Sequence, residues 1–92
     1  MEIKIKKSFS KTLKLTPKHI QQSVKTIIIP ALVKSDSLEA SGLDYTIMTG
    51  TKKDEKYYRI RVGDWRIGIE YIKPKVILIM ILSRGSIYKK FP

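Results

Sequence analysis

Hydrophobic and polar residues alternate with two different periods along the chain, and the change of period divides its 92 residues into two parts. Residues 2–6 alternate with period two, which predicts an amino-terminal strand. Apolar residues then recur at helical spacing between residues 20 and 32, which predicts an amphipathic helix. We expect Thr16 to cap this helix, with Pro17 in its first turn. A shorter helical stretch over residues 10–15 would complete a helical hairpin.

The predicted helix contains Pro30, which lacks a backbone N–H and crowds the preceding turn. We therefore expect the helix to kink or end near Ile29. The next segment, residues 35–42, is polar and rich in turn-forming residues, which predicts a loop.

From Tyr45 onward the period is two, which predicts strands over residues 45–48, 56–62, 65–72 and 76–83, with a polar loop over residues 50–56. The last strand shows no alternation, so we expect it to be central, with both faces covered. Helices followed by strands predict an α+β fold in one domain, residues 1–92. The expected architecture is an amino-terminal strand and a helical hairpin packed on an antiparallel β-meander, with about four strands and two helices.

Gly63-Asp64 is typical of a two-residue type II′ turn between the second and third of these strands. This turn would place Arg61 opposite Arg66 and Arg59 opposite Gly68. The two faces of the hairpin then separate by alternation. The face packed on the helix would carry Tyr58, Ile60, Val62, Trp65, Ile67, Ile69 and Tyr71, and the other face Tyr57, Arg59, Arg61, Arg66, Gly68 and Glu70.

Charge makes the second face a candidate binding site. The chain has 19 Lys and Arg against 8 Asp and Glu, a formal net charge of +11, which predicts an anionic partner, with nucleic acid as the first candidate. Arginine grips phosphate with paired hydrogen bonds, whereas lysine acts as a point charge. Like charges opposed across two strands are destabilising, so Arg61 facing Arg66 predicts an anion between them. We expect a phosphodiester there, with Gly68 leaving room for it beside Arg59.

Other classes of function are disfavoured by composition. The chain has no cysteine and one histidine, so we expect no metal site and no cofactor. Its longest apolar run, residues 76–82, is far shorter than the roughly 20 residues that cross a bilayer. The amino terminus shows no secretory signal pattern. We expect a cytoplasmic protein with no membrane partner.

Further candidates lie beside the arginine face. The last strand delivers Arg84 and Tyr88 to the rim of the sheet, where a rigid support suits working residues. Lys56, Lys89 and Lys90 are candidate RNA-binding residues. Glu70 shares the arginine face, where it would form a salt bridge to an arginine or act as an alternative base.

The run Tyr-Tyr-Arg-Ile-Arg-Val-Gly-Asp-Trp-Arg-Ile at residues 57–67, the apolar strand, and then Arg84 and Tyr88 resemble the carboxy-terminal half of the RelE/ParE toxin superfamily. This resemblance implies a four-stranded sheet with two helices, in the toxin of a type II toxin-antitoxin pair. RelE-type members cut messenger RNA, typically in the ribosomal A site, with basic residues and a tyrosine. ParE-type members instead poison DNA gyrase.

The residues that match the RelE-type pattern are Arg59, Arg61, Arg66, Arg84 and Tyr88. Two positions that are often lysine in the family are arginine here, and arginine does not readily donate a proton. The chain stops at Pro92, which predicts almost no carboxy-terminal helix, an element that some ribosome-dependent members possess.

Among the possible functions, we favour an endoribonuclease that promotes attack of a 2′-hydroxyl on the adjacent phosphate. Arg61, Arg66 and Arg84 would stabilise the transition state, and Tyr88 would act as base. The expected partners are a cognate acidic antitoxin, mRNA and the ribosome. The alternatives are a gyrase inhibitor and a catalytically silent nucleic-acid-binding relative.

Overall fold

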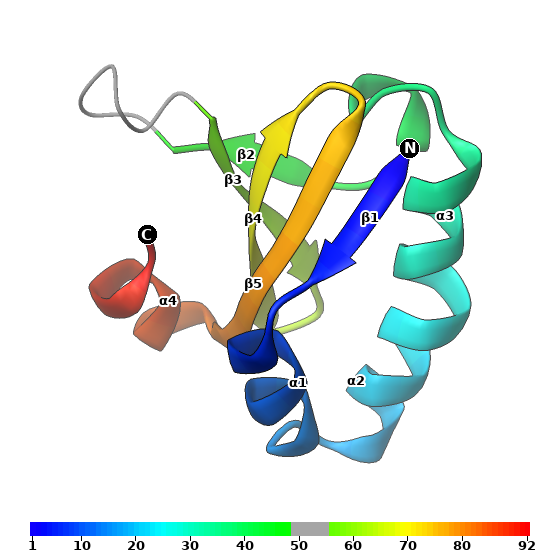
Figure 1. The fold of residues 1–92 in the computed structure, drawn as a ribbon. Coiled ribbons are helices and arrows are strands. Elements are labelled where there is room, and N and C mark those ends of the chain that lie inside the picture. Colours follow the sequence, from blue (N-terminus) through cyan, green and yellow to red (C-terminus); the bar gives the residue numbers. More distant parts are fainter. Residues whose placement is uncertain (49–55) are drawn as a thin grey trace.

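A five-stranded sheet with the strand order β1-β5-β4-β3-β2 forms the centre of the molecule (Figure 1). In this computed structural model, which describes residues 1–48 and 56–92, the strands are β1 (Glu2–Ile5), β2 (Tyr45–Ile47), β3 (Tyr57–Val62), β4 (Trp65–Ile72) and β5 (Lys75–Ser83). β1 runs parallel to β5, and the other neighbouring strands are antiparallel. The α+β class is confirmed, with five described strands where about four were predicted. All but the last residue of the predicted loop over residues 50–56 lies outside the described residues.

β5 lies between β1 and β4, as its unbroken apolar sequence predicted. β1 pairs with only the first part of β5, up to Leu78. Beyond that point the side chains of helix α1 (Lys7–Lys14) take the place of a neighbouring strand. The Ile81 N–H donates to Thr12 Oγ1 at 3.0 Å, and Ser8 Oγ donates to the carbonyl of Ile79. These two bonds satisfy the Ile79 carbonyl and the Ile81 N–H on this edge of β5.

A second helical segment is continuous from Lys18 to Lys34, in three parts: α2 (Lys18–Ser23), the π-helical turn η1 (Val24–Ile28) and α3 (Ile29–Lys34). We predicted that the helix would kink or end near Ile29. It does not end there, because α3 continues to Lys34. Because the wider π-helical turn interrupts the regular hydrogen-bond ladder just before Pro30, the helix absorbs the missing N–H and continues.

The predicted cap of this helix was also wrong. Thr16 does not cap α2, because its hydroxyl donates to the carbonyl of Leu13 at 2.7 Å and so finishes α1 instead. Pro17 has an extended backbone and precedes the first helical residue, Lys18. A short 3₁₀ turn, η2 (Glu39–Ser41), lies within the predicted loop before β2.

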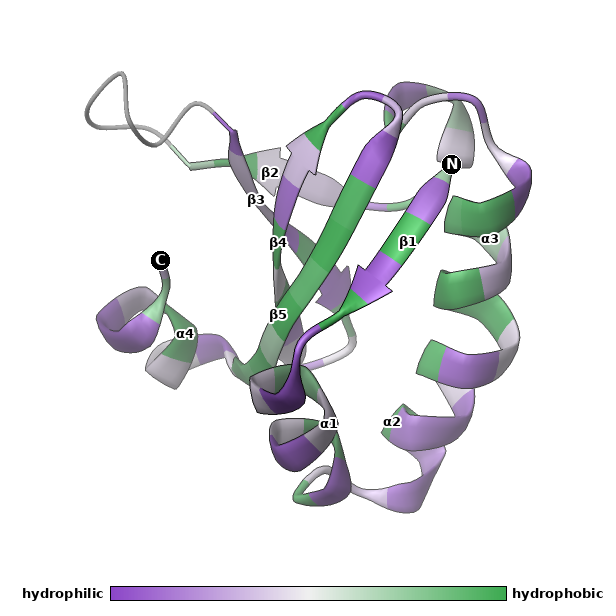
Figure 2. Ribbon diagram, in the orientation of Figure 1, coloured by the Kyte–Doolittle hydropathy of each residue, from purple (hydrophilic) through white to green (hydrophobic). Residues whose placement is uncertain are grey.

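The helices α1 to α3 cover one face of the sheet, and Figure 2 shows their apolar residues turned toward it. This contact forms the hydrophobic core, which includes Phe9, Ile20, Val24, Leu32, Ile60, Ile67, Ile69, Val76, Leu78 and Ile81. No helix in the described part of the chain is long and apolar enough to span a membrane.

The β3–β4 hairpin has the predicted register: Val62 pairs with Trp65, Arg61 with Arg66, and Arg59 with Gly68. Gly63 has a φ of 59°, and among the described residues only glycines have a positive φ, which suits the first central position of a type II′ turn. This hairpin directs its arginines away from the core. A register shift between β4 and β5 occurs at Gly68 and Ile69.

A carboxy-terminal helix, α4 (Arg84–Lys90), follows β5 and lies on the face of the sheet opposite the long helix (Figure 1). The prediction of almost no such helix was therefore wrong. Phe91 follows α4 and packs on Gly68, where an added Cβ would lie 2.6 Å from its ring. The expected space for a phosphate above Gly68 is filled by this ring, because a glycine allows an aromatic side chain to rest on the strand.

Candidate functional site

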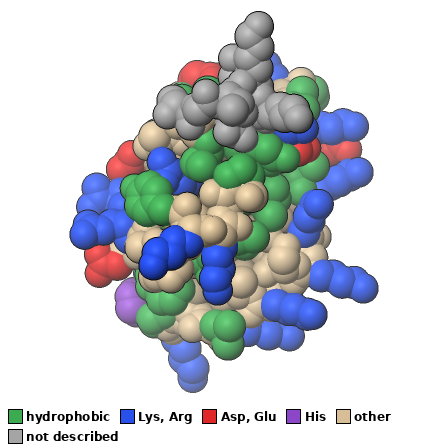
Figure 3. All heavy atoms as spheres, turned by 90° about the vertical axis from the view of Figure 1, so that its left-hand side faces the viewer, with side chains coloured by type: hydrophobic (Ala, Val, Ile, Leu, Met, Phe, Trp, Pro, Cys, Tyr) green, Lys and Arg blue, Asp and Glu red, His purple; other side chains and the backbone are tan. Residues whose placement is uncertain are grey.

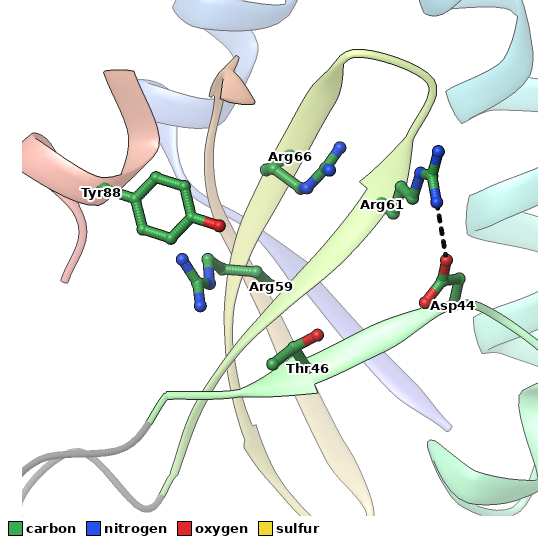
Figure 4. Close-up of a pocket in the computed structure, with 6 residues that line it drawn as sticks. All are labelled: Asp44, Thr46, Arg59, Arg61, Arg66 and Tyr88. Atoms are coloured by element: carbon green, nitrogen blue, oxygen red, sulfur yellow. Dashed lines mark ion pairs between the residues drawn. The ribbon is translucent and has the colours of Figure 1, made fainter. Parts of the chain in front are cut away.

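A pocket of about 230 Å³ lies on the arginine face of the sheet. Six side chains from β3, β4, α4 and the segment around β2 line it (Figure 4): Asp44, Thr46, Arg59, Arg61, Arg66 and Tyr88. The strand pairings explain why they meet. Arg61 is opposite Arg66 on β4, and Arg59 is opposite Thr46 on β2. Because all three arginines belong to the β3–β4 hairpin, strand alternation and the hairpin register are enough to bring them to one face.

Arg66 is held at the hairpin turn. Its Nη1 donates to the carbonyls of Gly63 and Trp65, each at 2.9 Å. Because a guanidinium has five N–H donors, these two bonds leave the donors on Nε and Nη2 for a ligand. The type II′ turn therefore restrains the arginine that faces Arg61 across the hairpin.

Arg61 pairs with a carboxylate. The distance from its Nη1 to Asp44 Oδ2 is 3.7 Å, and both side chains are exposed. The Arg61 backbone N–H also donates to the carbonyl of Asp44 at 2.8 Å, which fixes the two residues side by side. An exposed pair of this kind contributes at most about 1 kcal/mol to stability, so an incoming phosphate can replace the carboxylate at little cost.

Arg59 lies against Tyr88. The Arg59 Cζ is 4.3 Å from the centroid of the Tyr88 ring, and Figure 4 shows the Tyr88 hydroxyl directed toward the strands. This stacking is a cation–π contact between β3 and α4. The Nη1 of Arg59 is buried and has no hydrogen-bond partner among the described residues. A buried charged donor without a partner is costly, so a movement of the Arg59 side chain that brings this nitrogen to an acceptor such as a phosphate oxygen would be favourable.

The other predicted residues lie outside the pocket lining. Arg84 is the exposed first residue of α4, and it is one turn from Tyr88 on the same side of the helix. Its backbone N–H donates to the carbonyl of Asp64 at 2.9 Å, which joins α4 to the hairpin turn. Lys89 and Lys90 are exposed in the last turn of α4.

Glu70 pairs with Lys56 rather than with an arginine. The distance from Lys56 Nζ to Glu70 Oε1 is 3.6 Å, and Glu70 borders a different hollow near the β4–β5 turn. Glu70 is therefore at the wrong end of the hairpin for the predicted role as alternative base or arginine partner. Alternation placed it on the correct face, but its distance along the strand separates it from Arg66.

Sequence reasoning missed Asp44 and Thr46, which contribute a carboxylate and a hydroxyl to the pocket. The two residues are separated by one position, so alternation alone would have placed them on one face. What the sequence did not provide was the pairing of β2 with β3, which brings that face beside Arg59. Asp44 takes the place of Glu70 as the carboxylate near the arginines.

Basic side chains are spread over the side of the molecule where α4 lies. Figure 3 views the molecule from the side where α4 lies and shows Lys and Arg side chains distributed over this face, with few carboxylates. With a net charge of +11, the whole chain adds a positive field to the local cluster. A polyanion would be attracted to this face before any specific contact forms.

Comparison with known proteins decides the family. No family model matches the sequence. Among curated proteins, Toxin RelE3 of Methanocaldococcus jannaschii is 41% identical over 92 residues, and the match covers 100% of both chains. This chain belongs to the RelE toxin family. The resemblance seen in residues 57–88 is thereby confirmed.

Solved RelE structures agree with this membership. The RelB–RelE antitoxin–toxin complex from Methanococcus jannaschii matches with a TM-score of 0.76 and 40% identity, covering 97% of this chain and 99% of that chain. The archaeal RelE–RelB complex from Pyrococcus horikoshii OT3 matches with a TM-score of 0.67 and 22% identity, covering 91% and 94%. The second likeness is one of fold alone.

Proposed function

We propose that this chain is the toxin of a type II toxin-antitoxin pair and that it cleaves mRNA in the arginine pocket. The observation that carries the proposal is the convergence of Arg59, Arg61 and Arg66 with Tyr88 around one pocket of about 230 Å³. Family membership supports the same interpretation, because the relatives are RelE toxins. A gyrase inhibitor would not need these side chains to converge on one site, so we do not favour it.

The reaction is an internal transfer at phosphorus. The 2′-oxygen forms a bond to the adjacent phosphorus, the bond from phosphorus to the 5′-oxygen breaks, and a 2′,3′-cyclic phosphate and a 5′-hydroxyl result. The proton of the 2′-hydroxyl passes to a base in the pocket. The leaving 5′-oxygen takes a proton from solvent, which reaches the pocket because Tyr88 and Arg61 are exposed.

The arginines would act on the charge of the phosphate. Arg66 is preorganised by the turn carbonyls, and Arg59 would turn its Nη1, which lacks a partner in the described part of the chain, toward a phosphate oxygen. Donors fixed before the reaction stabilise developing charge without reorganising, and this electrostatic stabilisation usually contributes more to catalysis than any other effect. Arg61 would exchange Asp44 for a phosphate oxygen, and Arg84 would bind phosphate at the rim of the site.

Tyr88 is our candidate for the base, because its hydroxyl points toward the arginines from a separate element. Asp44 is the alternative, because it is the carboxylate that lines the pocket. Its pairing with Arg61 favours a role in holding that guanidinium when no RNA is bound.

The partners follow from the charge and the family. An acidic antitoxin would neutralise the arginine face, and both solved complexes contain a RelB partner. Lys89 and Lys90 would contact the RNA backbone beside the pocket, and Lys56, paired with Glu70 toward the other end of the hairpin, would contact it further along the strand. The presence of α4 removes the reason for separating this chain from ribosome-dependent members, so we expect cleavage to be faster on ribosome-bound mRNA. A complex that leaves Tyr88 and the arginines open would contradict direct occlusion by the antitoxin.

The test is incubation of the purified chain with end-labelled mRNA, with and without ribosomes. We expect fragments that carry 2′,3′-cyclic phosphate and 5′-hydroxyl ends, and no fragments from a variant with Arg59, Arg61 and Arg66 replaced by alanine. Intact mRNA in both conditions, or identical cleavage by the triple variant, would contradict the proposal.

A further inference from the structure

We infer that Phe91 is a positioning residue, whose ring holds α4 on the sheet at Gly68 and so places the Tyr88 hydroxyl at the arginine pocket. The inference rests on the proposed function, because Phe91 affects cleavage only if Tyr88 takes part in the reaction. Neither Phe91 nor Gly68 lines the pocket.

The contact between Phe91 and Gly68 is unusually close. A Cβ added to Gly68 would lie 2.6 Å from one ring carbon and 2.7 Å from two others, so only a glycine lets the ring rest there. Phe91 is 3% exposed. Tyr57, on the neighbouring strand, meets the Phe91 ring edge-on with centroids 5.6 Å apart. The Phe91 ring is therefore closely packed against Gly68 of β4 and Tyr57 of β3.

The contact between Phe91 and Gly68 fixes the orientation of α4. Phe91 and Ile87 are four residues apart, so both lie on the side of the helix that faces the sheet, and Ile87 is fully buried. The Phe91 N–H donates to the carbonyl of Ile87 at 3.0 Å, which continues the helical ladder to the anchor. Tyr88 follows Ile87 about 100° around the helix and meets Arg59. With two anchors on the sheet, the direction of Tyr88 is determined.

Apart from Phe91, the helix is held by buried Ile87, by the Arg84 N–H bond to the Asp64 carbonyl and by the stacking of Tyr88 on Arg59. Ile87 and Phe91 are buried, but they are not part of the hydrophobic core on the other face of the sheet. Tyr88 is 62% exposed, and α4 has seven residues, too few for a helix that persists without tertiary contacts. Loss of Phe91 should therefore release α4 by local unfolding and leave β5 and the core folded.

The experiment compares Phe91→Ala with Phe91→Leu, which keeps an apolar side chain over Gly68, in the full chain. Val33→Ala, at an exposed apolar position of α3, is the matched control. Each is measured for kcat and KM on mRNA, for amide exchange in α4, and for the nuclear Overhauser contact between Tyr88 and Arg59. Phe91→Ala and Tyr88→Phe are also combined in one protein.

We expect Phe91→Ala to speed amide exchange in α4, abolish the contact between Tyr88 and Arg59, and lower kcat by up to the roughly 10²- to 10⁴-fold of a lost acid or base. KM should rise less than kcat falls, because the arginines of β3 and β4 stay in place and only the contacts from Arg84, Lys89 and Lys90 on α4 are lost. Phe91→Leu should recover most of kcat, and Val33→Ala should match the original chain. In the Tyr88→Phe background, Phe91→Ala should cause a much smaller further loss of kcat, limited to the contribution of Arg84, which is released with the same helix.

An equal loss of kcat with and without the Tyr88 hydroxyl would overturn the positioning role, as would full kcat with α4 released. If Tyr88→Phe alone leaves kcat unchanged, the proposed role of Tyr88 fails. The nuclear Overhauser contact between Tyr88 and Arg59 then tests whether Phe91 anchors α4. This contact must vanish in Phe91→Ala and persist in Phe91→Leu, and any other pattern overturns the anchoring by Phe91.

Discussion

The salt dependence of RNA binding gives a direct count of the arginines that meet phosphate. Three arginines line the pocket, and each phosphate contact on a single strand contributes a slope of about −0.7 to the logarithmic plot of affinity against salt. For an RNA too short to reach Arg84 or the lysines outside the pocket, three contacts give a slope near −2. The affinity for this RNA should then fall about 20-fold between roughly 50 and 200 mM salt.

Removing one arginine should remove one contact. In Arg66→Ala the slope should drop to about −1.4, so the same change of salt weakens binding only about sevenfold. Lys25→Ala is the matched control, because it removes one positive charge from the exposed surface of the helical segment on the other face of the sheet. Its slope should stay near that of the original chain.

The assay is fluorescence anisotropy with a labelled RNA oligonucleotide at several salt concentrations. A slope near zero would refute the pocket as a phosphate site. An equal reduction of the slope in Arg66→Ala and Lys25→Ala would also refute it, because binding would then follow total charge rather than this arrangement of arginines.

Three further substitutions test separate features of the molecule. Asp44→Asn should tighten RNA binding by up to about fivefold in the same anisotropy assay, since one charge near a phosphate in water is worth about 1 kcal/mol; weaker binding would contradict this. Gly63→Ala should lower the free energy of unfolding by about 1–2 kcal/mol in a denaturant titration, because its φ of 59° is unfavourable for a side chain. Burial, followed by the charge of Glu39, raises the pKa of Tyr58. As pH rises, the Tyr58 phenol of the unfolded chain ionises at a lower pH than that of the folded chain. The free energy of unfolding is therefore constant below pH of about 10, and it falls as pH rises from there through the folded-state pKa. Tyr58→Phe should reduce this alkaline loss, and an unchanged pH profile would exclude Tyr58 as its source.

The arginine face could be predicted from sequence because local rules determine it. The Gly63-Asp64 turn fixes the hairpin register, and alternation then assigns every residue from Tyr57 to Glu70 to one face or the other. Neither step needs knowledge of the rest of the chain. The same reasoning correctly separated the arginines from the core.

The rest of the site depends on contacts between distant segments. Asp44 reaches the pocket because β2 pairs with β3, and no local signal predicts which strand β2 will join. Phe91 covers Gly68 from 23 positions away, so the glycine looked open when only the hairpin was considered. Helix α4 was missed for the same reason, since seven residues form a helix here through their anchors on the sheet. Long-range packing decided each of these features.

The most direct test of the proposed chemistry is the single-turnover rate of mRNA cleavage by Tyr88→Phe, measured beside its affinity for the same RNA. Tyr45→Phe makes the same chemical change at a strand position paired with buried Ile60, away from the arginines, and serves as the control. We predict that Tyr88→Phe lowers the rate by about 10²- to 10⁴-fold with little change in affinity, while Tyr45→Phe cleaves normally. A Tyr88→Phe protein that cleaves at the original rate would contradict the assignment of the pocket's base.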